Sequence, residues 1–375
     1  MSMKVLISTD TVGGVFAYTA ELATALEAAG NEVLVATMGP PLSPTQRQAL
    51  PARVHESGFR LEWMKDPWDE VAAAGALLLA LEEQERPNVI HLSSYAHGDL
   101  PFQAPKVLVA HSCVLSWWRA VQGGEAPRSW NRYRAEMAAG LESVDAIVAP
   151  TTAMLRELER DHAFNPANAQ VIHNGCPTPP PPQPSSPSRE LHRLFRSAGR
   201  KVDAVGERGP FVLGSGRLWD ATKNLAALDM AAEGLAWPVV VAGDLGGAGA
   251  PQHALSTGVL DEARLASLRR EAPIYAAPSL YEPFGRDILG AARDGCALVL
   301  GDIPSLHELW EDAAIFVDPR DPNGLRQALA CLIEAPQLRA DLAERARSRA
   351  AEYSIERTAA AYSALYQRLA AKVSA

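Results

Sequence analysis

Short runs of Val, Ile and Leu alternate along this chain with longer stretches rich in Ala, Leu, Glu and Arg that have helical periodicity. Buried parallel strands are continuous apolar runs of this kind, and each needs a crossover connection, usually a helix, to reach the next strand. The alternation therefore predicts an α/β fold with parallel sheets. The expected strands are 4–7, 32–36, 89–92, 106–110, 146–148 and 170–172, then 210–214, 238–242, 274–277, 297–300 and 315–317.

One proline-rich segment, from Cys176 to Ser188, interrupts this alternation. Proline fixes φ and lacks a backbone N–H, so we expect an extended linker here, not a helix or a central strand. A length of 375 residues also fits two domains, since a domain usually has roughly 100 to 200 residues. We expect two Rossmann-like, doubly wound domains facing each other across a cleft. The expected bounds are 1–176 for the first domain, 177–188 for the linker, 189–354 for the second domain, and 355–375 for a C-terminal helix that packs back toward the first domain.

Composition and charge exclude several classes of protein. The chain is 47% apolar and 21% charged, values typical of a folded globular protein. A net charge of −9 makes nucleic acid an unexpected partner and limits membrane association to peripheral contact. The four cysteines are scattered without a CxxC pair, and the N-terminal segment turns polar at Ser8. We therefore expect a cytoplasmic protein without a zinc site or disulfide framework, and make no prediction of its oligomeric state.

Two glycines, Gly13 and Gly14, lie between the first expected strand and the helix that follows it. Glycines at such a turn let backbone N–H groups approach a phosphate or sugar closely, and the positive end of the helix dipole assists. A tight turn without a ligand is the alternative interpretation.

Two cations follow the first strand of the second half, Arg217 and Lys223. A guanidinium and an ammonium in one loop can together neutralise a diphosphate. Two solvated surface cations are the alternative.

A third motif, APSLYEPFGRDIL, occupies residues 277–289. A strand ends shortly before Glu282, and Pro283 and Gly285 then begin a helix. The free N–H groups of that helix can bind sugar hydroxyls or phosphate oxygens.

In this order the motifs resemble those of the retaining glycosyltransferases of family 4, which have the GT-B fold of two Rossmann-like domains. The resemblance extends over nearly the whole chain through further segments at 109–111, 171–175, 242–244 and 318–319. It implies transfer of a sugar from a nucleotide diphosphate sugar to a carbohydrate or other hydroxyl-bearing small molecule. It also implies retention of the anomeric configuration, and neither a metal ion nor a cofactor beyond the nucleotide-sugar substrate.

The resemblance further implies roles for individual residues. Gly13, Gly14, Arg217 and Lys223 would bind the donor diphosphate, whose developing charge the two cations stabilise without a metal. Two catalytic residues are implied, His111 next to the reacting carbon and Glu282 on the donor sugar. The donor-sugar site would include Phe284, Gly285 and Arg286. For His111, a packed core histidine stays the alternative.

The chain departs from the family pattern at Gly290, where the family usually has a second, ribose-binding glutamate. Asp287 and Asp294 lie three residues before and four after Gly290, on the same stripe of a helix, so either aspartate is a candidate ribose ligand. Arg286 is a second departure. A guanidinium there suits an acidic sugar such as a uronic acid, and an Arg side chain in solvent is the alternative.

The acceptor side is represented by Trp117, Trp118 and Arg119, which follow the strand that leads to His111. Aromatic rings beside a guanidinium suit a sugar acceptor, and they suit core packing as well. Because Gly290 replaces the glutamate, a nucleotide-sugar binding or regulatory protein with reduced or lost transfer activity is the second functional hypothesis.

Overall fold

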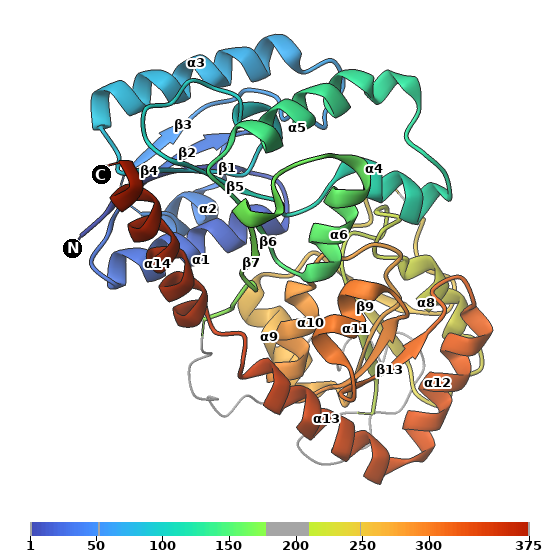
Figure 1. The fold of residues 1–375 in the computed structure, drawn as a ribbon. Helices are drawn as coiled ribbons and strands as arrows, with labels where there is room; N and C mark the ends of the chain where they lie inside the picture. Colours follow the sequence, from blue (N-terminus) through green and yellow to red (C-terminus); the bar gives the residue numbers. More distant parts are fainter. Residues whose placement is uncertain (1, 52, 178–209, 248, 374–375) are drawn as a thin grey trace. The chain divides into compact units, whose positions relative to one another are not determined.

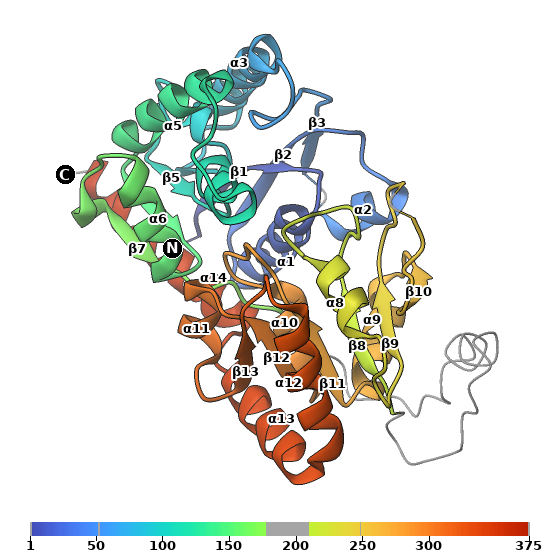
Figure 2. The same cartoon turned by 90° about the vertical axis from the view of Figure 1, so that its right-hand side faces the viewer.

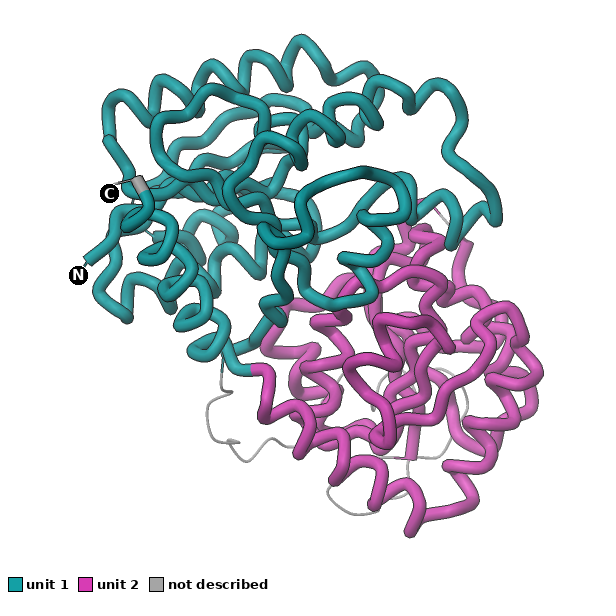
Figure 3. The backbone as a smooth tube through the Cα atoms, viewed as in Figure 1, with its two compact units in different colours: residues 1–177, 354–375 teal, residues 178–353 magenta. Residues whose placement is uncertain are grey.

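The computed structural model describes residues 2–51, 53–177, 210–247 and 249–373. Two compact units divide the chain: unit 1 comprises residues 1–177 and 354–375, and unit 2 comprises residues 178–353 (Figure 3). Apart from Pro177, the expected linker at 177–188 lies outside the described residues.

Unit 1 contains a parallel sheet with the strand order β3-β2-β1-β4-β5-β6-β7 (Figure 1). The chain starts at an interior strand, β1, and builds outward first on one side and then on the other, as in doubly wound folds. The strands are β1 (Lys4–Asp10), β2 (Glu32–Met38), β3 (Val54–Glu56), β4 (Val89–Leu92), β5 (Lys106–Val109), β6 (Ala146–Ala149) and β7 (Ala169–Val171). The α-helices are α1 (Gly14–Ala28), α2 (Pro44–Ala49), α3 (Trp68–Glu85), α4 (Val114–Trp117), α5 (Asn131–Ser143), α6 (Thr152–Asp161) and α14 (Ile355–Val373).

Apolar residues on both faces of this sheet explain its continuous hydrophobic strands. Successive side chains of a strand point to opposite faces, and in β1 Val5 and Ile7 belong to one buried cluster whereas Leu6 belongs to the other. Helices α1 and α14 cover the first face, and α3, α5 and α6 cover the second (Figure 1). The sheet is therefore buried on both sides, and ligands can reach it only at the strand ends.

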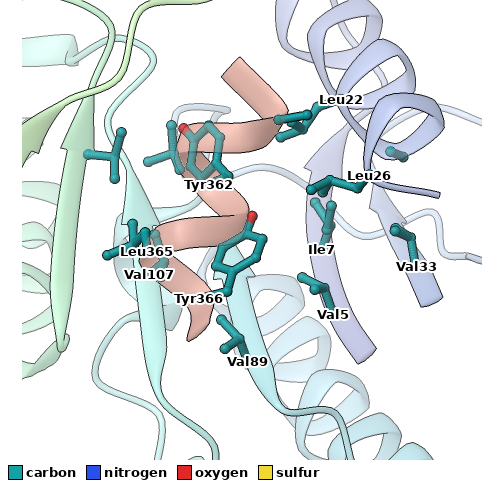
Figure 4. Close-up of a cluster of buried hydrophobic side chains, with 14 of the residues drawn as sticks. Val5, Ile7, Leu22, Leu26, Val33, Val89, Val107, Tyr362, Leu365 and Tyr366 are labelled. Carbon is teal, nitrogen blue, oxygen red and sulfur yellow. The ribbon is translucent and has the colours of Figure 1, made fainter. Parts of the chain in front are cut away.

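The C-terminal helix α14 is part of unit 1 and contacts α1 and β4. Figure 4 shows its residues Tyr362, Leu365 and Tyr366 packed among apolar side chains of the sheet and of α1. The chain enters α14 beside Gly175, where a Cβ atom would lie 2.2 Å from the backbone carbonyl carbon of Ser354. Only glycine permits this close passage.

Unit 2 repeats the architecture with a parallel sheet in the order β10-β9-β8-β11-β12-β13 (Figure 2). The strands are β8 (Val212–Ser215), β9 (Val239–Ala242), β10 (Leu255–Gly258), β11 (Ile274–Ala277), β12 (Ala297–Gly301) and β13 (Ala314–Val317). The α-helices of its described residues are α8 (Leu225–Ala231), α9 (Glu262–Glu271), α10 (Arg286–Arg293), α11 (Pro304–Trp310), α12 (Pro322–Glu334) and α13 (Pro336–Ala350).

The predicted fold class is confirmed, because both units are Rossmann-like parallel sheets with helices. Every expected strand is present, with ends that differ by at most three residues. Two strands were not expected, β3 and β10. Both are short edge strands whose residues are not fully buried, so they lack the apolar signal of the central strands. In the described part of the chain, no helix combines the length and apolarity needed to span a membrane.

Candidate functional site

A pocket in unit 2 lies where the strand order reverses, at the carboxyl ends of β8 and β11. Doubly wound sheets bind their ligands at this place, because the connections leave the sheet in opposite directions there and open a crevice. The polar residues that line the pocket are Ser215, Lys223, Tyr275, Ser279, Glu282 and Asp287. The structure thus brings together Lys223, Glu282 and Asp287, three residues that the sequence placed in the donor site.

An ion pair between Lys223 and Glu282 forms the centre of this pocket, with 2.6 Å between Lys223 Nζ and Glu282 Oε2. Burial disfavours the ammonium, but the negative charges of Glu282 and Asp287 outweigh it and raise the pKa of Lys223 above its usual value. Lys223 therefore remains a cation. An ammonium has three N–H donors, and the bond to Glu282 uses one of them.

The loop that contains Lys223 is shaped by two close backbone approaches. Gly216 has a φ of 144°, and a Cβ atom there would lie 3.0 Å from Cγ of Lys223. A Cβ atom on Gly243 would lie 1.7 Å from the carbonyl oxygen of Gly216. Glycines at both positions let the loops after β8 and β9 pack backbone against backbone.

Arg217 lies in the same loop, and its Nη2 donates to Asp220 Oδ2 at 2.6 Å. Its guanidinium also stacks over the Trp219 ring, 4.9 Å from the centroid. Burial alone would raise the pKa of Asp220, but the Thr222 hydroxyl and Arg217 lower it, so the carboxylate stays charged. The Arg217 side chain is 40% exposed and does not line the pocket that contains Lys223.

Hydrogen bonds tie the Lys223 loop to the loop that contains Glu282. Asn224, at a φ of 52°, donates from Nδ2 to the carbonyl oxygen of Pro278 at 2.9 Å. Thr222 accepts a backbone bond from Leu280 at 2.9 Å. These contacts explain why a lysine and a glutamate 59 residues apart meet.

The helix after Glu282 begins as the sequence predicted, with Gly285 as N-cap at a φ of 88°. Arg286 is the first residue of this helix and is half-buried. Phe284 is 3% exposed and packs edge-on against Tyr353, with 5.7 Å between the ring centroids. In the structure Phe284 is a core residue of unit 2 and does not line the pocket.

The region around Gly290 separates the two candidate aspartates. Asp287 lines the pocket, whereas Asp294 follows the end of α10 and binds Arg269, with 2.8 Å between Oδ2 and Nε. A Cβ atom on Gly290 would lie 2.9 Å from Arg269 Cζ. The guanidinium of Arg269 thus fills the space beside Gly290, and the structure does not bring Asp294 to the pocket.

Ser215 and Tyr275 are among the pocket residues that the sequence reasoning missed. Their hydroxyl groups share a hydrogen bond of 2.7 Å, and burial raises the pKa of Tyr275 well above its usual value. Both residues lie within strands, where a hydroxyl group gives no signal of its own in a single sequence. Their proximity on the neighbouring strands β8 and β11 becomes visible only in the sheet order.

In unit 1, Gly13 is the N-cap of α1 with a φ of 75°, and a Cβ atom on Gly14 would meet no atom within 4 Å. The start of α1 is thus open. His111 follows β5 and lies edge-on to Tyr18, with 4.9 Å between the ring centroids. The histidine is half-buried.

The residues predicted for the acceptor are engaged in packing and ion pairs within unit 1. Arg119 binds Asp161 and Glu157 of α6, with N–O distances of 2.6 Å to each. Trp117 and Trp118 contact each other edge-on at 5.5 Å, and Trp118 packs against a buried cluster. This arrangement corresponds to the packing alternative, in which Arg119 links α6 to the helical turn Trp118–Gln122 that directly follows α4.

Among the described residues, no three His, Cys, Asp or Glu side chains are grouped so as to hold a metal ion.

Two family models of glycosyltransferases match this chain, one in each half. Residues 12–179 match the family model described as Glycosyltransferase Family 4, and residues 223–349 match the model described as Glycosyl transferases group 1. Phosphatidyl-myo-inositol mannosyltransferase of Mycolicibacterium smegmatis is 36% identical over 30% of this chain and 28% of its own length. D-inositol 3-phosphate glycosyltransferase of Salinispora arenicola is 28% identical over 72% of this chain and 66% of its own length. The aligned regions thus span less than two thirds of these curated relatives.

Solved structures of low sequence identity have the same fold. Sucrose-phosphate synthase from Thermosynechococcus elongatus has a TM-score of 0.75 at 18% identity, with 99% of this chain and 100% of that chain covered. HepE of Anabaena in complex with UDP-glucose has a TM-score of 0.72 at 17% identity, with 99% of each chain covered. Taken with the two parallel sheets, the matches in both halves of the chain support a glycosyltransferase with the GT-B fold.

Proposed function

We propose that this protein is a retaining glycosyltransferase that moves a sugar from a nucleotide diphosphate sugar to an acceptor hydroxyl without a metal ion. The observation that carries the proposal is the Lys223–Glu282 pair at the strand-order reversal of unit 2. It combines a permanent cation for a phosphate with a carboxylate for sugar hydroxyls in one pocket.

In this proposal the cations of the Lys223 loop stabilise the departing diphosphate. Lys223 retains N–H donors beyond its bond to Glu282, and its raised pKa keeps it charged when the leaving group develops its charge. Arg217 lies outside the pocket lining with a 40% exposed side chain, so it serves the outer part of the diphosphate. Gly13 and Gly14 supply the open helix start of unit 1 as a further phosphate contact.

The sugar is proposed to bind next to Glu282, with His111 of unit 1 as the second catalytic residue. The peptide around Glu282 is fixed because its carbonyl oxygen accepts a 2.6 Å bond from Ser305 Oγ. A fixed backbone orients the carboxylate toward the sugar hydroxyls before the donor binds, which is how preorganised sites gain rate.

For the ribose, the structure favours Asp287 over Asp294. Asp287 lines the pocket, and Asp294 is buried against Arg269. We expect Asp287→Ala to weaken binding of a nucleoside diphosphate and Asp294→Ala to leave it unchanged. Equal affinities in both variants and the wild type would exclude an aspartate in place of the family's second glutamate.

The names of similar proteins are consistent with a nucleotide-sugar donor. One structural neighbour, HepE of Anabaena, was solved with UDP and glucose and also with UDP-glucose. Curated relatives are named as a mannosyltransferase, a glycosyltransferase and an alpha-maltose-1-phosphate synthase. The base and the sugar of the donor are left for experiment.

A second candidate function is favoured by Gly290. The guanidinium of Arg269 fills the space beside this glycine, so a ribose contact of the usual kind is absent there. A protein that binds nucleotide sugars without transferring them would retain the Lys223–Glu282 pocket. Binding without turnover is therefore the outcome that would favour this candidate.

The proposal is tested first by thermal shift against a panel of nucleoside diphosphates and their sugars, because a ligand of the native state raises its apparent stability. The panel includes a nucleotide uronic acid. A preference for it that is lost in Arg286→Ala would assign an acidic sugar, and an unchanged preference in that variant would exclude the role of Arg286. The selected donor is then followed by NMR for hydrolysis and transfer, with and without EDTA.

We expect turnover with retained anomeric configuration, unaffected by EDTA and abolished in Glu282→Gln. The matched control is Glu83→Gln, which changes an exposed glutamate on α3 and leaves turnover intact. An inverted product, or full activity in Glu282→Gln, would contradict the proposal.

A further inference from the structure

Trp219 lies between the two cations of the loop after β8, Arg217 and Lys223. The sequence motifs singled out both cations and gave no role to the tryptophan between them. Trp219 is 51% exposed, and it is not a member of the apolar cluster that forms the core of the described part of unit 2. Core packing therefore does not account for a large ring at this position.

The Trp219 ring is fixed in place by the loop after β9. Its Nε1 donates to Asp244 Oδ2 at 3.1 Å, and Asp244 Oδ1 accepts a bond from the N–H of Gly246 at 3.0 Å. Gly246 has a φ of 52°, and a Cβ atom on it would lie 1.7 Å from Trp219 Cδ1. Because the glycine has no side chain, the indole ring can lie directly against its backbone. The ring is therefore held in one place although much of it is exposed.

The Arg217 guanidinium is held by this ring and by a carboxylate. Arg217 Cζ lies 4.9 Å from the centroid of the Trp219 ring, and Arg217 Nη2 donates to Asp220 Oδ2 at 2.6 Å. The Asp220 carboxylate is itself fixed, because its Oδ1 accepts bonds from the N–H and from the hydroxyl group of Thr222, at 3.0 and 2.6 Å. The face of an indole ring attracts a cation, at exposed sites as well as buried ones. Two fixed neighbours thus restrain a side chain of a type that has much rotamer freedom.

This restraint favours the binding of a phosphate group by Arg217. An arginine side chain that moves freely loses conformational entropy when it binds a ligand, and one that is already held loses less. A guanidinium has five N–H donors, and the bond to Asp220 uses one of them, so Arg217 can bind phosphate oxygen atoms without leaving its neighbours. Because Lys223 lines the pocket and Arg217 does not, a longer phosphate ligand is better able to reach both cations.

We propose that Trp219 is a positioning residue for Arg217, and that it thereby contributes to the preference of this site for a diphosphate over a monophosphate. The contribution to diphosphate binding rests on the proposed function. The restraint of Arg217 by the ring does not rest on it, so the two parts can fail separately.

The restraint is tested first, on the full-length protein without a ligand. Side-chain proton–nitrogen NMR correlation spectra observe the Arg217 Nε–H group, which is identified by its absence in Arg217→Met. We expect a chemical shift that is displaced by the ring current of Trp219. The displacement is lost in Trp219→Leu, which keeps an apolar side chain without a ring, and is largely retained in Trp219→Phe. An unchanged Arg217 signal in Trp219→Leu would overturn the restraint.

Trp237→Leu is the matched control for the loss of a tryptophan. Trp237 belongs to the same unit and also stacks with an arginine, Arg339, whose Cζ lies 4.8 Å from the ring centroid. Because Trp237 packs against the buried cluster, its substitution lowers the stability measured by urea unfolding. We expect it to change neither the Arg217 signal nor the affinity for a phosphate ligand. A Trp237→Leu protein that loses the displacement of the Arg217 signal would assign the effect to stability and overturn the restraint.

The contribution to binding is then measured by calorimetric titration with UDP, ADP and GDP and with their monophosphates. For the pair that binds most tightly, we expect Trp219→Leu to narrow the preference for the diphosphate by about twofold to fivefold, the size of one exposed cation–π pair. Trp219→Phe restores most of this preference. In an Arg217→Met background the Trp219→Leu change has no further effect, because Trp219 acts through Arg217.

Three results would each overturn the contribution of Trp219 to binding: an equal loss in both backgrounds, an unchanged preference in Trp219→Leu, or tighter diphosphate binding in that variant. If none of the diphosphates binds the wild type, the proposed function fails, and the NMR comparison alone decides whether the ring restrains Arg217.

Discussion

His91, a buried histidine of β4, makes the stability of unit 1 sensitive to acid. The side chain is fully buried in β4, and its Nδ1 lies 2.6 Å from the Tyr366 hydroxyl of α14. Burial, together with the nearby His111, lowers the pKa of His91 from 6.5 to about 3. The unfolded chain therefore binds a proton at a higher pH than the folded chain does. The stability that neutral His91 provides is complete above pH 6.5 and is lost as the pH falls toward 3.

The size of this effect follows from the two pKa values. Between pH 7 and pH 5 the unfolded state becomes almost fully protonated and the folded state does not, which costs about 2 kcal/mol of unfolding free energy. The perturbation is the double variant His91→Phe/Tyr366→Phe. It replaces both hydrogen-bond partners by apolar rings, so neither is left buried without a partner.

Hydrogen exchange of the β4 and α14 amides measures the free energy of opening of unit 1 directly. Between pH 7 and pH 5 we expect the free energy of opening to fall by about 2 kcal/mol more in the wild type than in the double variant. His97 and His162 also have lowered pKa values and contribute to the slope in both proteins, so the difference isolates His91. Equal losses in the two proteins would refute a neutral, buried His91.

Three further variants test packing and ion pairs. Arg119→Met leaves two carboxylates of α6 without their cation, and because the pairs are partly exposed we expect a loss of about 2 kcal/mol in urea unfolding; a change below about 0.5 kcal/mol would refute the structural role. Gly243→Ala forces a Cβ atom to within 1.7 Å of the Gly216 carbonyl oxygen, so we expect a lower melting temperature and weaker nucleotide binding, and unchanged values would contradict the close approach. Asp294→Ala removes the buried partner of Arg269 and should lower stability by about 2 kcal/mol with unchanged nucleotide affinity; a loss of affinity would return this aspartate to the donor site.

Much of the fold was predictable because parallel strands are apolar throughout. Strands such as Val89–Leu92 and Ile274–Ala277 have the bounds that the sequence predicted. The edge strands Val54–Glu56 and Leu255–Gly258 were not predictable from apolar runs, since an edge strand is only partly buried and needs no such run.

The site residues could be predicted where they lie in a loop or helix start that directly follows a strand. The loop with Lys223 and the helix start after Glu282 both follow strands, and parallel strand ends meet at one edge of the sheet. Phe284 shows the limit of this reasoning: it lies in the same motif, yet its ring packs against Tyr353, a contact across 69 residues that no local pattern reveals. For the same reason the pairing of Arg119 with α6 was not foreseen.

Gly290 shows why the replacement of a residue that is usual in the family is hard to interpret from sequence alone. Helix periodicity placed Asp287, Gly290 and Asp294 on one stripe, but α10 ends at Arg293. Asp294 therefore follows the helix and pairs with Arg269 of the neighbouring α9. The space beside Gly290 is thus filled by Arg269, which belongs to another segment of the chain, α9.

The central claim is that the pocket of unit 2 holds a diphosphate through Lys223. The test is calorimetric titration of the wild type and of Lys223→Met. Each protein is titrated with the nucleoside diphosphate selected by the thermal-shift panel and with the matching monophosphate. The control is Lys372→Met, which changes an exposed lysine of α14. We predict that the wild type and the control bind the diphosphate at least ~10-fold more tightly than the monophosphate, and that Lys223→Met loses this preference. A Lys223→Met protein that retains the wild-type preference would contradict the account.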